Sequence, residues 1–400
     1  MKKILFLGAA RFQTPAIEYA LEAGYRVITL DNRPQNPGHA MAHKAFNDIS
    51  ITEVDRVLEV AKSENIDGVL SFGSDVGALT EATVAHHMKL PGNPISTIEL
   101  LTNKGKFRRF LEERNLQKPI TCIQVSESDW QKSIRNLNFA ELKYIVKPLD
   151  SSGSKGVSIV EDPTKFEEHL KYAFVFSRSR QAVVEEYLTK TGFQICGDGF
   201  FEKGQLKFIH FGDGHFYEPK VSLAPFAETF PSTRDSGFLN KVETKLQSVL
   251  KAAGFIRGSF NLDVMVLENG EPFIIEIGPR AGGNYIPSAI KYATGVDVVG
   301  AAVESALNLD FSLNIDGSTN HCVASYMVHS FENINFKGFH LSSEVQGHVL
   351  QQSDYLTHGE ELHQFKTSSH VCSNILLRFD DQKEMLDTIT NMRNHLEFNV

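Results

Sequence analysis

The chain has 400 residues, and its 40 Lys and Arg against 49 Asp and Glu give a formal net charge of −9. Hydrophobic residues make up 42% and charged residues 22% of the chain, which are ordinary values for a globular protein and exclude disordered, collagen-like and coiled-coil chains. A mildly acidic protein is poorly suited to phosphate backbones and anionic membrane surfaces, so we expect no nucleic-acid partner and no membrane partner.

Hydropathy and cysteine usage both favour a cytoplasmic location. No apolar stretch of the sequence reaches the roughly 18 residues that a membrane-spanning helix needs. The apolar run at 4–7 is too short for a signal peptide, because Arg11 and Pro15 interrupt the segment after it. The four cysteines form neither a Cys-x-x-Cys pair nor a zinc-binding spacing, which is typical of thiols in a reducing cytosol.

The first 94 residues alternate between short apolar runs and amphipathic stretches. The runs suit buried parallel strands and the stretches suit helices, so their alternation predicts an α/β doubly wound parallel sheet. We expect strands at 4–7, 25–30 and 67–72, and helices at 14–23, 51–65 and 76–88. The segment from Pro91 to Pro94 consists of residues that end helices and strands, so we place the boundary of this domain there and its range at 1–94.

Beyond Pro94 the pattern changes from α/β to α+β. A helix at 97–115 is followed by pairs of apolar runs joined by Gly or Asn-Gly turns, which predict antiparallel hairpins; the clearest joins 262–267 to 273–277. After Phe311 the segments become short and rich in β-branched and aromatic residues, and a helix near 382–395 closes the chain. We therefore expect a second domain at 95–311 and a small α+β domain at 312–400.

A lysine followed by a flexible loop is the first chemical motif. An apolar strand delivers Lys147, Pro148 ends the strand, and small or flexible residues fill 151–156 before another strand. Small residues let backbone N–H groups approach an anion and the lysine adds a positive charge, so the motif indicates a phosphate site. It is not a Walker A loop, because the glycines follow the lysine and the chain returns to a strand. The alternative is a mobile hairpin loop with a solvated lysine.

Two adjacent acids, Glu185 and Glu186, stand at the end of a second apolar strand. Neighbouring side chains of a strand point to opposite faces, so at most one of the two acids faces a shared site. The position fits a hinge between two lobes, near 185–188. The alternative is a strand end with solvated acids.

Two more acids lie on the arms of the hairpin that joins 262–267 to 273–277. Asp263 and Glu276 both interrupt runs that should be buried, and two carboxylates in such a setting need a cation. Oxygen ligands suit Mg²⁺, which completes its shell with phosphates and water. Arg280 follows on a Pro/Gly-rich turn, where a guanidinium can hold a carboxylate or a phosphate. The alternative is a structural ion pair between Arg280 and one of the acids.

Two other stretches carry weaker signals. The segment 209–220 contains His210, His215, Tyr217 and Lys220. It overlaps the end of a strand predicted at 206–211 and is otherwise expected to be rich in loops at the depth of the predicted site, where it would bind substrate or form an ordered surface loop. The turn after the first strand lacks the Gly-x-Gly-x-x-Gly pattern of dinucleotide sites, which argues against an NAD-dependent oxidoreductase.

The order of these motifs resembles that of the ATP-grasp superfamily. Lys104, Lys147 ahead of its glycine-rich loop, the acidic hinge, and the Asp…Glu hairpin with its trailing Arg follow one another, and the resemblance spans roughly 1–310. The N-terminal domain resembles the one that precedes the ATP-grasp fold. The last 80 residues resemble the small C-terminal domain of carboxylate–amine ligases and biotin carboxylase-like members.

The resemblance implies a role for each motif. Lys104 and Lys147 would contact the phosphates of ATP, and Arg280 would stabilise the acyl-phosphate and the transferred phosphoryl group. Asp263 and Glu276 would hold Mg²⁺, or Mn²⁺, between the phosphates. The hinge would line the adenine pocket, partly through backbone groups. The residues implied for the flap and the hinge are Ser151, Ser152, Gly153, Ser154, Gly156, Glu185, Glu186 and Leu188.

The chain departs from the pattern of the superfamily at two positions. The superfamily usually places an acid for the ribose shortly after the hinge, whereas Gln194 stands there and can still hydrogen-bond a hydroxyl. The metal motif usually reads Glu-x-Asn, whereas this chain has Gly278, so a second metal ion would need water in place of the missing ligand. A substrate contact near Asp75 is a further implication of the resemblance.

The implied activity is ATP-dependent ligation of a carboxylate to an amine. Phosphorylation by ATP turns the carboxylate into an acyl-phosphate, and the amine then displaces phosphate to form a C–N bond, leaving ADP and phosphate as products. Such phosphoryl transfer needs charge neutralisation and alignment more than a nucleophilic side chain. The alternatives are a bicarbonate-activating carboxylase-like enzyme and a nucleotide-binding protein without turnover. The expected partners are small molecules, and a homodimer is compatible with the superfamily.

Overall fold

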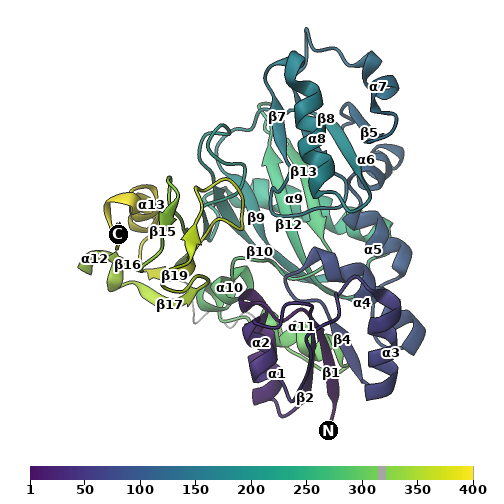
Figure 1. Ribbon diagram of the computed structural model, residues 1–400, viewed down its shortest axis with the longest axis vertical. Coiled ribbons are helices and arrows are strands. Elements are labelled where there is room, and N and C mark those ends of the chain that lie inside the picture. Colours follow the sequence, from purple (N-terminus) through teal and green to yellow (C-terminus); the bar gives the residue numbers. More distant parts are fainter. Residues whose placement is uncertain (314–320, 400) are drawn as a thin grey trace.

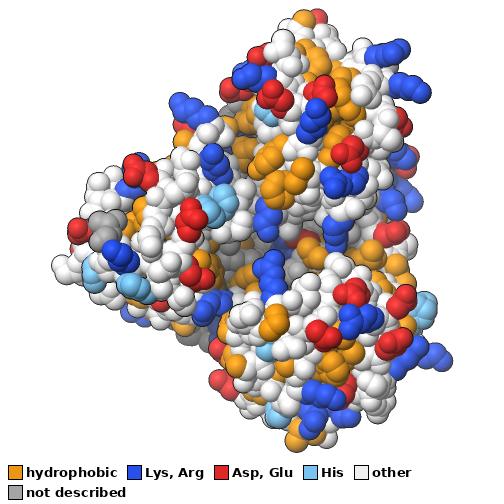
Figure 2. All heavy atoms as spheres, in the orientation of Figure 1, with side chains coloured by type: hydrophobic (Ala, Val, Ile, Leu, Met, Phe, Trp, Pro, Cys, Tyr) orange, Lys and Arg blue, Asp and Glu red, His pale blue; other side chains and the backbone are white. Residues whose placement is uncertain are grey.

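The computed structural model describes residues 1–313 and 321–399, which form three bodies around a central hollow (Figures 1 and 2). The N-terminal body lies at the bottom of Figure 1, a second body lies at the top, and the C-terminal body lies to the left. Within these residues, none of the helices combines the length and the hydropathy of a membrane-spanning segment.

The N-terminal body is a parallel sheet with the strand order β3-β2-β1-β4, which confirms the predicted α/β doubly wound sheet. The apolar run at 4–7 became β1 because its residues are buried on both faces. The edge strand β3 was missed because most of it is exposed and carries no apolar run. Its elements are β1 (Lys3–Leu7), α1 (Thr14–Glu22), β2 (Arg26–Leu30), α2 (Pro37–Met41), β3 (Lys44–Phe46), α3 (Val54–Glu64), β4 (Gly68–Leu70) and α4 (Asp75–Met88).

Two helices, rather than the single predicted one, connect this body to the next. Asn103 breaks the helix between α5 (Ile95–Thr102) and α6 (Lys104–Glu113), because its backbone is extended and its side chain caps α6 by accepting a hydrogen bond from Lys106 N. The break places Lys104 at the first position of α6.

The second body is an antiparallel sheet with the order β5-β8-β6-β7. Helix α8 covers it with Phe166, Leu170 and Phe174, which pack on Val146 and Val184. Its elements are β5 (Cys122–Ser126), α7 (Trp130–Ser133), β6 (Tyr144–Pro148), β7 (Ser158–Val160), α8 (Phe166–Phe176) and β8 (Gln181–Glu186).

A large antiparallel sheet forms the centre of the molecule, in the order β13-β12-β9-β10-β11-β14-β19-β17. The pairing of β11 with β14 makes the C-terminal strands a continuation of this sheet. Its strands and adjoining helices are β9 (Gln194–Glu202), β10 (Gln205–His215), β11 (Ala227–Phe230), α9 (Ser236–Ala253), β12 (Gly258–Val266), β13 (Pro272–Gly278), α10 (Ile286–Thr294), α11 (Val298–Ala306), β14 (Cys322–Val328), β17 (Val349–Asp354) and β19 (Ser373–Phe379).

The C-terminal body covers the far end of this sheet with short strands and two helices. The predicted closing helix ends at Thr390. The remaining elements are β15 (Ile334–Asn335), β16 (Phe339–Leu341), α12 (Ser343–Gln346), β18 (Glu361–Leu362), α13 (Gln382–Thr390) and β20 (Leu396–Phe398). The division of the chain at Pro94 and Phe311 stays a prediction, and part of 312–400, the segment 314–320, lies outside the described residues.

One apolar core joins the N-terminal body to the large sheet. Helices α10 and α11 carry Ile286, Ile290 and Val303, which share a buried cluster with Ile4 of β1 and Phe200 of β9. Because this cluster is continuous, the N-terminal body and the sheet face the central hollow in a fixed relation. Lysine and arginine side chains surround the hollow in Figure 2.

Candidate active site

The hairpin of β12 and β13 brings the two predicted metal ligands together. Asp263 and Glu276 are directly opposite each other in the antiparallel register, so they share one face of the sheet. Burial raises the pKa of Asp263 to about 7, and the neighbouring Glu276 adds to the rise. Two carboxylates held this close favour a cation between them, and their oxygen donors fit Mg²⁺ or Mn²⁺. Within the described residues there is no cluster of three or more His, Cys, Asp or Glu arranged for a metal ion.

Gln194, the candidate for the ribose, lies beside this pair. Its Nε2 donates a 2.6 Å hydrogen bond to Asp263 Oδ1 from the first residue of the neighbouring strand β9. The Gln194 amide therefore lies next to the acid pair.

Arg280 is held by a residue of the N-terminal body. Its Nε and Nη2 donate to the two carboxylate oxygens of Asp75, at 2.8 and 2.7 Å. Burial alone would raise the pKa of Asp75, but the charges of Arg280 and Lys104 hold it below its usual value. The expected alternative, an ion pair of Arg280 with Asp263 or Glu276, is wrong, because the bidentate partner comes from α4.

The turn that carries Arg280 is held by Asp198 of β9. Its Oδ2 accepts from Gly282 N at 2.8 Å, and its Oδ1 accepts from Asn261 Nδ2 at 2.9 Å. Burial raises the pKa of Asp198 to about 6, against the lowering effect of these hydrogen bonds. Sequence reasoning missed Asp198, although it interrupts a buried strand just as Asp263 does.

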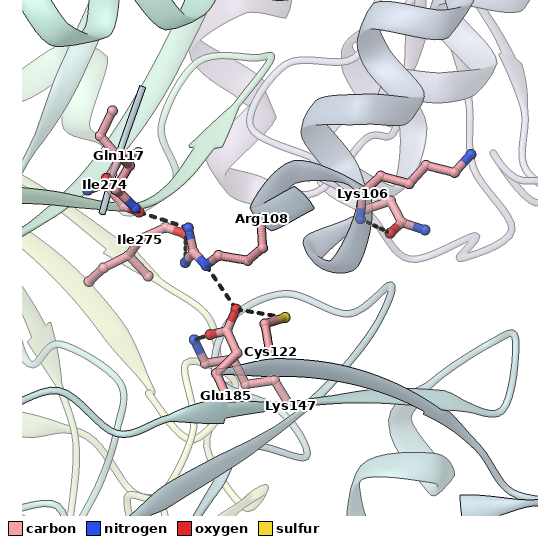
Figure 3. A network of polar contacts seen from close by, with 9 residues as sticks. Lys106, Arg108, Gln117, Cys122, Lys147, Glu185, Ile274 and Ile275 are labelled. Atoms are coloured by element: carbon pink, nitrogen blue, oxygen red, sulfur yellow. Dashed lines mark hydrogen bonds and ion pairs between the residues drawn. The ribbon is translucent and has the colours of Figure 1, made fainter. Parts of the chain in front are cut away.

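Glu185 lies at the centre of a buried ion-pair network (Figure 3). Its side chain is 2% exposed and accepts from Arg108 Nε at 2.9 Å and from Lys147 Nζ at 2.5 Å. Arg108 also donates to the carbonyls of Ile274 and Ile275, so the network ties β8 and β6 to β13. Burial would raise the pKa of Glu185, but the two cations hold it at about 2. The two alternatives, a solvated acid at the strand end and a solvated lysine, are therefore wrong for Glu185 and Lys147.

The loop after Lys147 is fixed by hydrogen bonds at both of its ends. Lys104 Nζ donates to Ser151 O at 2.7 Å, which joins α6 to the start of the loop. Ser154 has a φ of 58° and donates from Oγ to Leu223 O at 2.8 Å. Ser368 of the C-terminal body donates from Oγ to Gly153 O at 3.1 Å. Lys104 and the loop that we call the flap (151–156) therefore meet, and their contact with phosphates stays a prediction.

The expected loop at 209–220 is wrong over most of its length. His210 and His215 lie on β10, and burial lowers the pKa of each to about 4. His215 pairs with Thr229 Oγ1 at 2.9 Å, and Tyr217 pairs with His329 of the C-terminal body at 3.0 Å. The substrate contact expected of this stretch stays a prediction.

Comparisons with known proteins agree with this geometry. No protein-family model matches the chain. Among curated proteins, it is similar to the carbamoyl phosphate synthase large chain of Kocuria rhizophila, with 25% identity over 299 residues that cover 70% of this chain and 25% of that protein. The chain thus spans about a quarter of the length of the first such relatives, 25% and 26%.

Among solved structures, the chain is similar to the L-amino acid ligase from Bacillus licheniformis, with a TM-score of 0.83, 18% identity and coverage of 100% of this chain and 98% of that one. It is similar to the phosphoribosylglycinamide synthetase from Anaerococcus prevotii, with a TM-score of 0.76, 19% identity and coverage of 100% and 99%. It is also similar to the biotin carboxylase domain of the Hydrogenobacter thermophilus 2-oxoglutarate carboxylase, solved as a dimer with MgADP and bicarbonate, with a TM-score of 0.76, 13% identity and coverage of 100% and 90%.

The chain has the ATP-grasp fold. The resemblance found in the sequence is confirmed at this level, because the whole chain superimposes on these structures. It stays a prediction that the second body and the large sheet are the two lobes of the ATP-grasp unit and that the N-terminal sheet is the domain that precedes it.

The structure also brings charged side chains into buried pairs that the sequence did not reveal. Arg108 was missed because it lies in an amphipathic helix with many other charged residues. Asp75 was anticipated only as a weak substrate contact, and its pairing with Arg280 joins positions 205 residues apart. Glu228 on β11 is 5% exposed and was missed because Ala-Glu-Thr-Phe gives no motif. The nucleotide, metal and catalytic roles of all site residues stay predictions.

Proposed function

We propose that this protein is an ATP-dependent carboxylate–amine ligase that works through an acyl-phosphate and releases ADP and phosphate. The single observation that carries the proposal is the opposed pair of acids Asp263 and Glu276 beside Gln194, in an ATP-grasp cleft. The named functions of similar proteins, an L-amino acid ligase and a phosphoribosylglycinamide synthetase, support it. The substrates are small molecules, and their identity is the subject of the experiment below.

Each group of residues in the cleft would have its own role in phosphoryl transfer. Asp263 and Glu276 would hold Mg²⁺, which supplies charge neutralisation to the phosphates when bound. Lys104 and Lys147 would hold the phosphates under the flap, and Glu186 and Leu188 would line the adenine pocket with Glu185 behind them. Arg280, fixed by Asp75, would hold the acyl-phosphate, and closure of the flap would keep water from an intermediate that hydrolyses easily.

The experiment is a screen for ADP release with pairs of carboxylates and amines, followed by mass spectrometry of the product. The proposal expects ADP release that needs both partners and a product with a new C–N bond. Asp263→Asn and Glu276→Gln keep the side-chain sizes and should each reduce the rate by more than about 100-fold, since partners outside the coordination shell already cost 10–100-fold. If both variants leave nucleotide affinity and rate unchanged, the metal assignment is wrong.

A second candidate is activation of bicarbonate. It is supported by the similarity to a carbamoyl phosphate synthase and to a carboxylase domain solved with bicarbonate. In the same screen, ADP release that depends on bicarbonate and needs no amine would replace the ligase proposal with this one. Nucleotide binding without ADP release under any condition would favour a protein without turnover. Light scattering would test the homodimer, and the cytoplasmic location stays a prediction.

A further inference from the structure

Glu228 is a buried carboxylate with one oxygen left unpaired. Its side chain is 5% exposed, and Oε1 accepts a 3.2 Å hydrogen bond from Asn284 Nδ2. Oε2 is buried and has no hydrogen-bond partner among residues 1–313 and 321–399. A buried charged oxygen without a partner is costly, so native proteins rarely keep one unless a ligand completes it.

The sheet register places Glu228 on the face that carries the metal-site acids. Gln194 of β9 pairs with Gly214 of β10, and Gly214 pairs with Glu228 of β11, so the three residues form one row on one face. At the usual strand spacing the two ends of this row are about 10 Å apart. Gln194 donates a hydrogen bond to Asp263, so the acid pair and Glu228 lie at the two ends of this row, on the same face of the sheet. Between them the glycine contributes no side chain, and a Cβ there would lie 3.1 Å from the Phe216 ring.

The partner of Glu228, Asn284, is itself held rigidly. Asn284 and Tyr285 both have left-handed backbone conformations, with φ of 51° and 58°. The Asn284 carbonyl accepts from Ser325 Oγ at 2.5 Å and from Asn374 Nδ2 at 3.4 Å. Strands β14 and β19 hold the backbone in this conformation, so that the Asn284 side-chain amide points at Glu228 Oε1. The second carboxylate oxygen is left available to another group.

Acids outnumber cations among the groups that face Glu228. Its electrostatic neighbours are Asp263 of β12, Asp198 and Cys196 of β9, Tyr355 after β17, and Arg280 after β13. Arg280 is already paired with Asp75. Burial raises the pKa of Glu228 to about 8, and the charges of Asp263 and Asp198 add to the rise. This environment attracts a cation, and a group of three acids suited to a metal ion is absent from the described residues.

We propose that Glu228 binds the ammonium group of the amine substrate and accepts one of its protons. This inference rests on the proposed ligase function. Binding of the ammonium group displaces the proton that Glu228 keeps in the empty site. The resulting carboxylate takes a proton from the ammonium ion and leaves a neutral amine with a free electron pair. The nitrogen attacks the acyl-phosphate carbon, the C–N bond forms as the C–O bond to phosphate breaks, and the second nitrogen proton leaves with the phosphate. Glu228 then returns its proton to water.

The test compares two nucleophiles on the variant Glu228→Gln, which keeps the size of the side chain. With the acid found in the ADP-release screen, hydroxylamine traps the acyl-phosphate as a hydroxamate, and hydroxylamine is uncharged at neutral pH and needs no base. Product formation with the cognate amine should fall about 100-fold at pH 7, the usual size of a general-base effect, while hydroxamate formation stays within about threefold of wild type. The amine deficit should shrink as the pH is raised, because solution then supplies amine that is already neutral.

Glu304→Gln is the matched control. Glu304 is also a buried carboxylate, 8% exposed, but it accepts from the hydroxyls of Tyr19 and Tyr25 and lies outside the cleft. It should change neither rate. Equal losses of amide and hydroxamate in Glu228→Gln, or unchanged amide formation, would overturn the proposal. A wild-type protein that releases ADP with no acid and forms no hydroxamate would instead overturn the ligase function itself.

Discussion

Position 278 carries glycine where the superfamily usually places asparagine, and the structure gives a steric reason. A Cβ at 278 would stand 3.1 Å from Asp75 Oδ1 and 3.2 Å from Arg280 Cζ, so any side chain would press on their ion pair. We expect Gly278→Asn to lower the free energy of unfolding by about 1–3 kcal/mol, as overpacking does. It should also slow ADP release by up to about 100-fold through misplacement of Arg280.

Denaturant unfolding and the ADP assay check this prediction. Gly283→Ala is the control on the same turn, because nothing lies within 4 Å of the Cβ it would add. Unchanged stability and rate in Gly278→Asn would mean that the Arg280–Asp75 pair tolerates a side chain there.

The raised pKa values of the buried acids predict a stability loss as pH rises through neutrality. Glu228, with a pKa of about 8 against the usual 4.5, keeps a proton in the folded state where the unfolded chain has released it. Between these two pKa values the unfolded state binds fewer protons, so this group lowers the free energy of unfolding as pH rises from about 4.5 to about 8. Below about pH 6.5 the buried histidines, with lowered pKa values, have the opposite sign, so the net fall is expected between about pH 6.5 and 8. Thermal unfolding should show this fall in wild type and a smaller one in Glu228→Gln; parallel curves would contradict the assigned pKa.

At the scale of elements, the network around Glu185 holds β6, β8, α6 and β13 together. Glu185→Gln should lower the free energy of unfolding by about 3–5 kcal/mol, because it leaves Arg108 and Lys147 buried without their anion. Since the folded pKa of about 2 lies below the usual 4.5, the stabilisation is present above pH 4.5 and is lost as pH falls toward 2. Glu186→Gln, at the partly exposed neighbour, is the control and should change stability little; equal losses in both variants would exclude the network as the cause.

The predicted elements differ in whether residues close in the sequence are enough to determine them. The hairpin of β12 and β13 was predicted because an Asn-Gly turn and two apolar runs lie within a short segment. The stretch 209–220, predicted to be rich in loops, contains Gly212 and Gly214. In the structure those glycines lie within β10, where the Phe230 and Phe216 rings occupy the space of their side chains. Packing between residues distant in the sequence determines that β10 continues through these glycines, and no local sequence pattern indicates it.

The same distinction applies to the candidate site. Asp263, Glu276 and the flap follow from neighbouring residues, so the sequence was sufficient to single them out. Glu185 pairs with Arg108 across 77 positions, and Arg280 pairs with Asp75 across 205. Which charge neutralises which is a property of the fold, and the sequence alone could not assign it.

At the scale of the whole molecule, the flap of one lobe is held by the C-terminal body. Ser368→Ala removes the side-chain hydrogen bond to Gly153 O and leaves the one from Ser368 N at 3.4 Å. A single hydrogen bond of about 0.5–1.5 kcal/mol corresponds to a two- to tenfold rise in KM for ATP. Steady-state kinetics with varied ATP check this. Ser369→Ala is the control, because Ser369 bonds Thr367 rather than the flap. A KM unchanged in Ser368→Ala would show that the flap closes without the C-terminal body.

The pairing of β11 with β14 has a consequence for the integrity of the chain. β11 carries Glu228 and is flanked by β10 on one side and by the C-terminal strands on the other. Removal of everything after 320 would turn β11 into an open edge, with its backbone N–H and C=O groups free to recruit strands from other molecules. The C-terminal body is thus a permanent cap against aggregation, and a shortened chain would accumulate as insoluble protein before its catalysis could be measured.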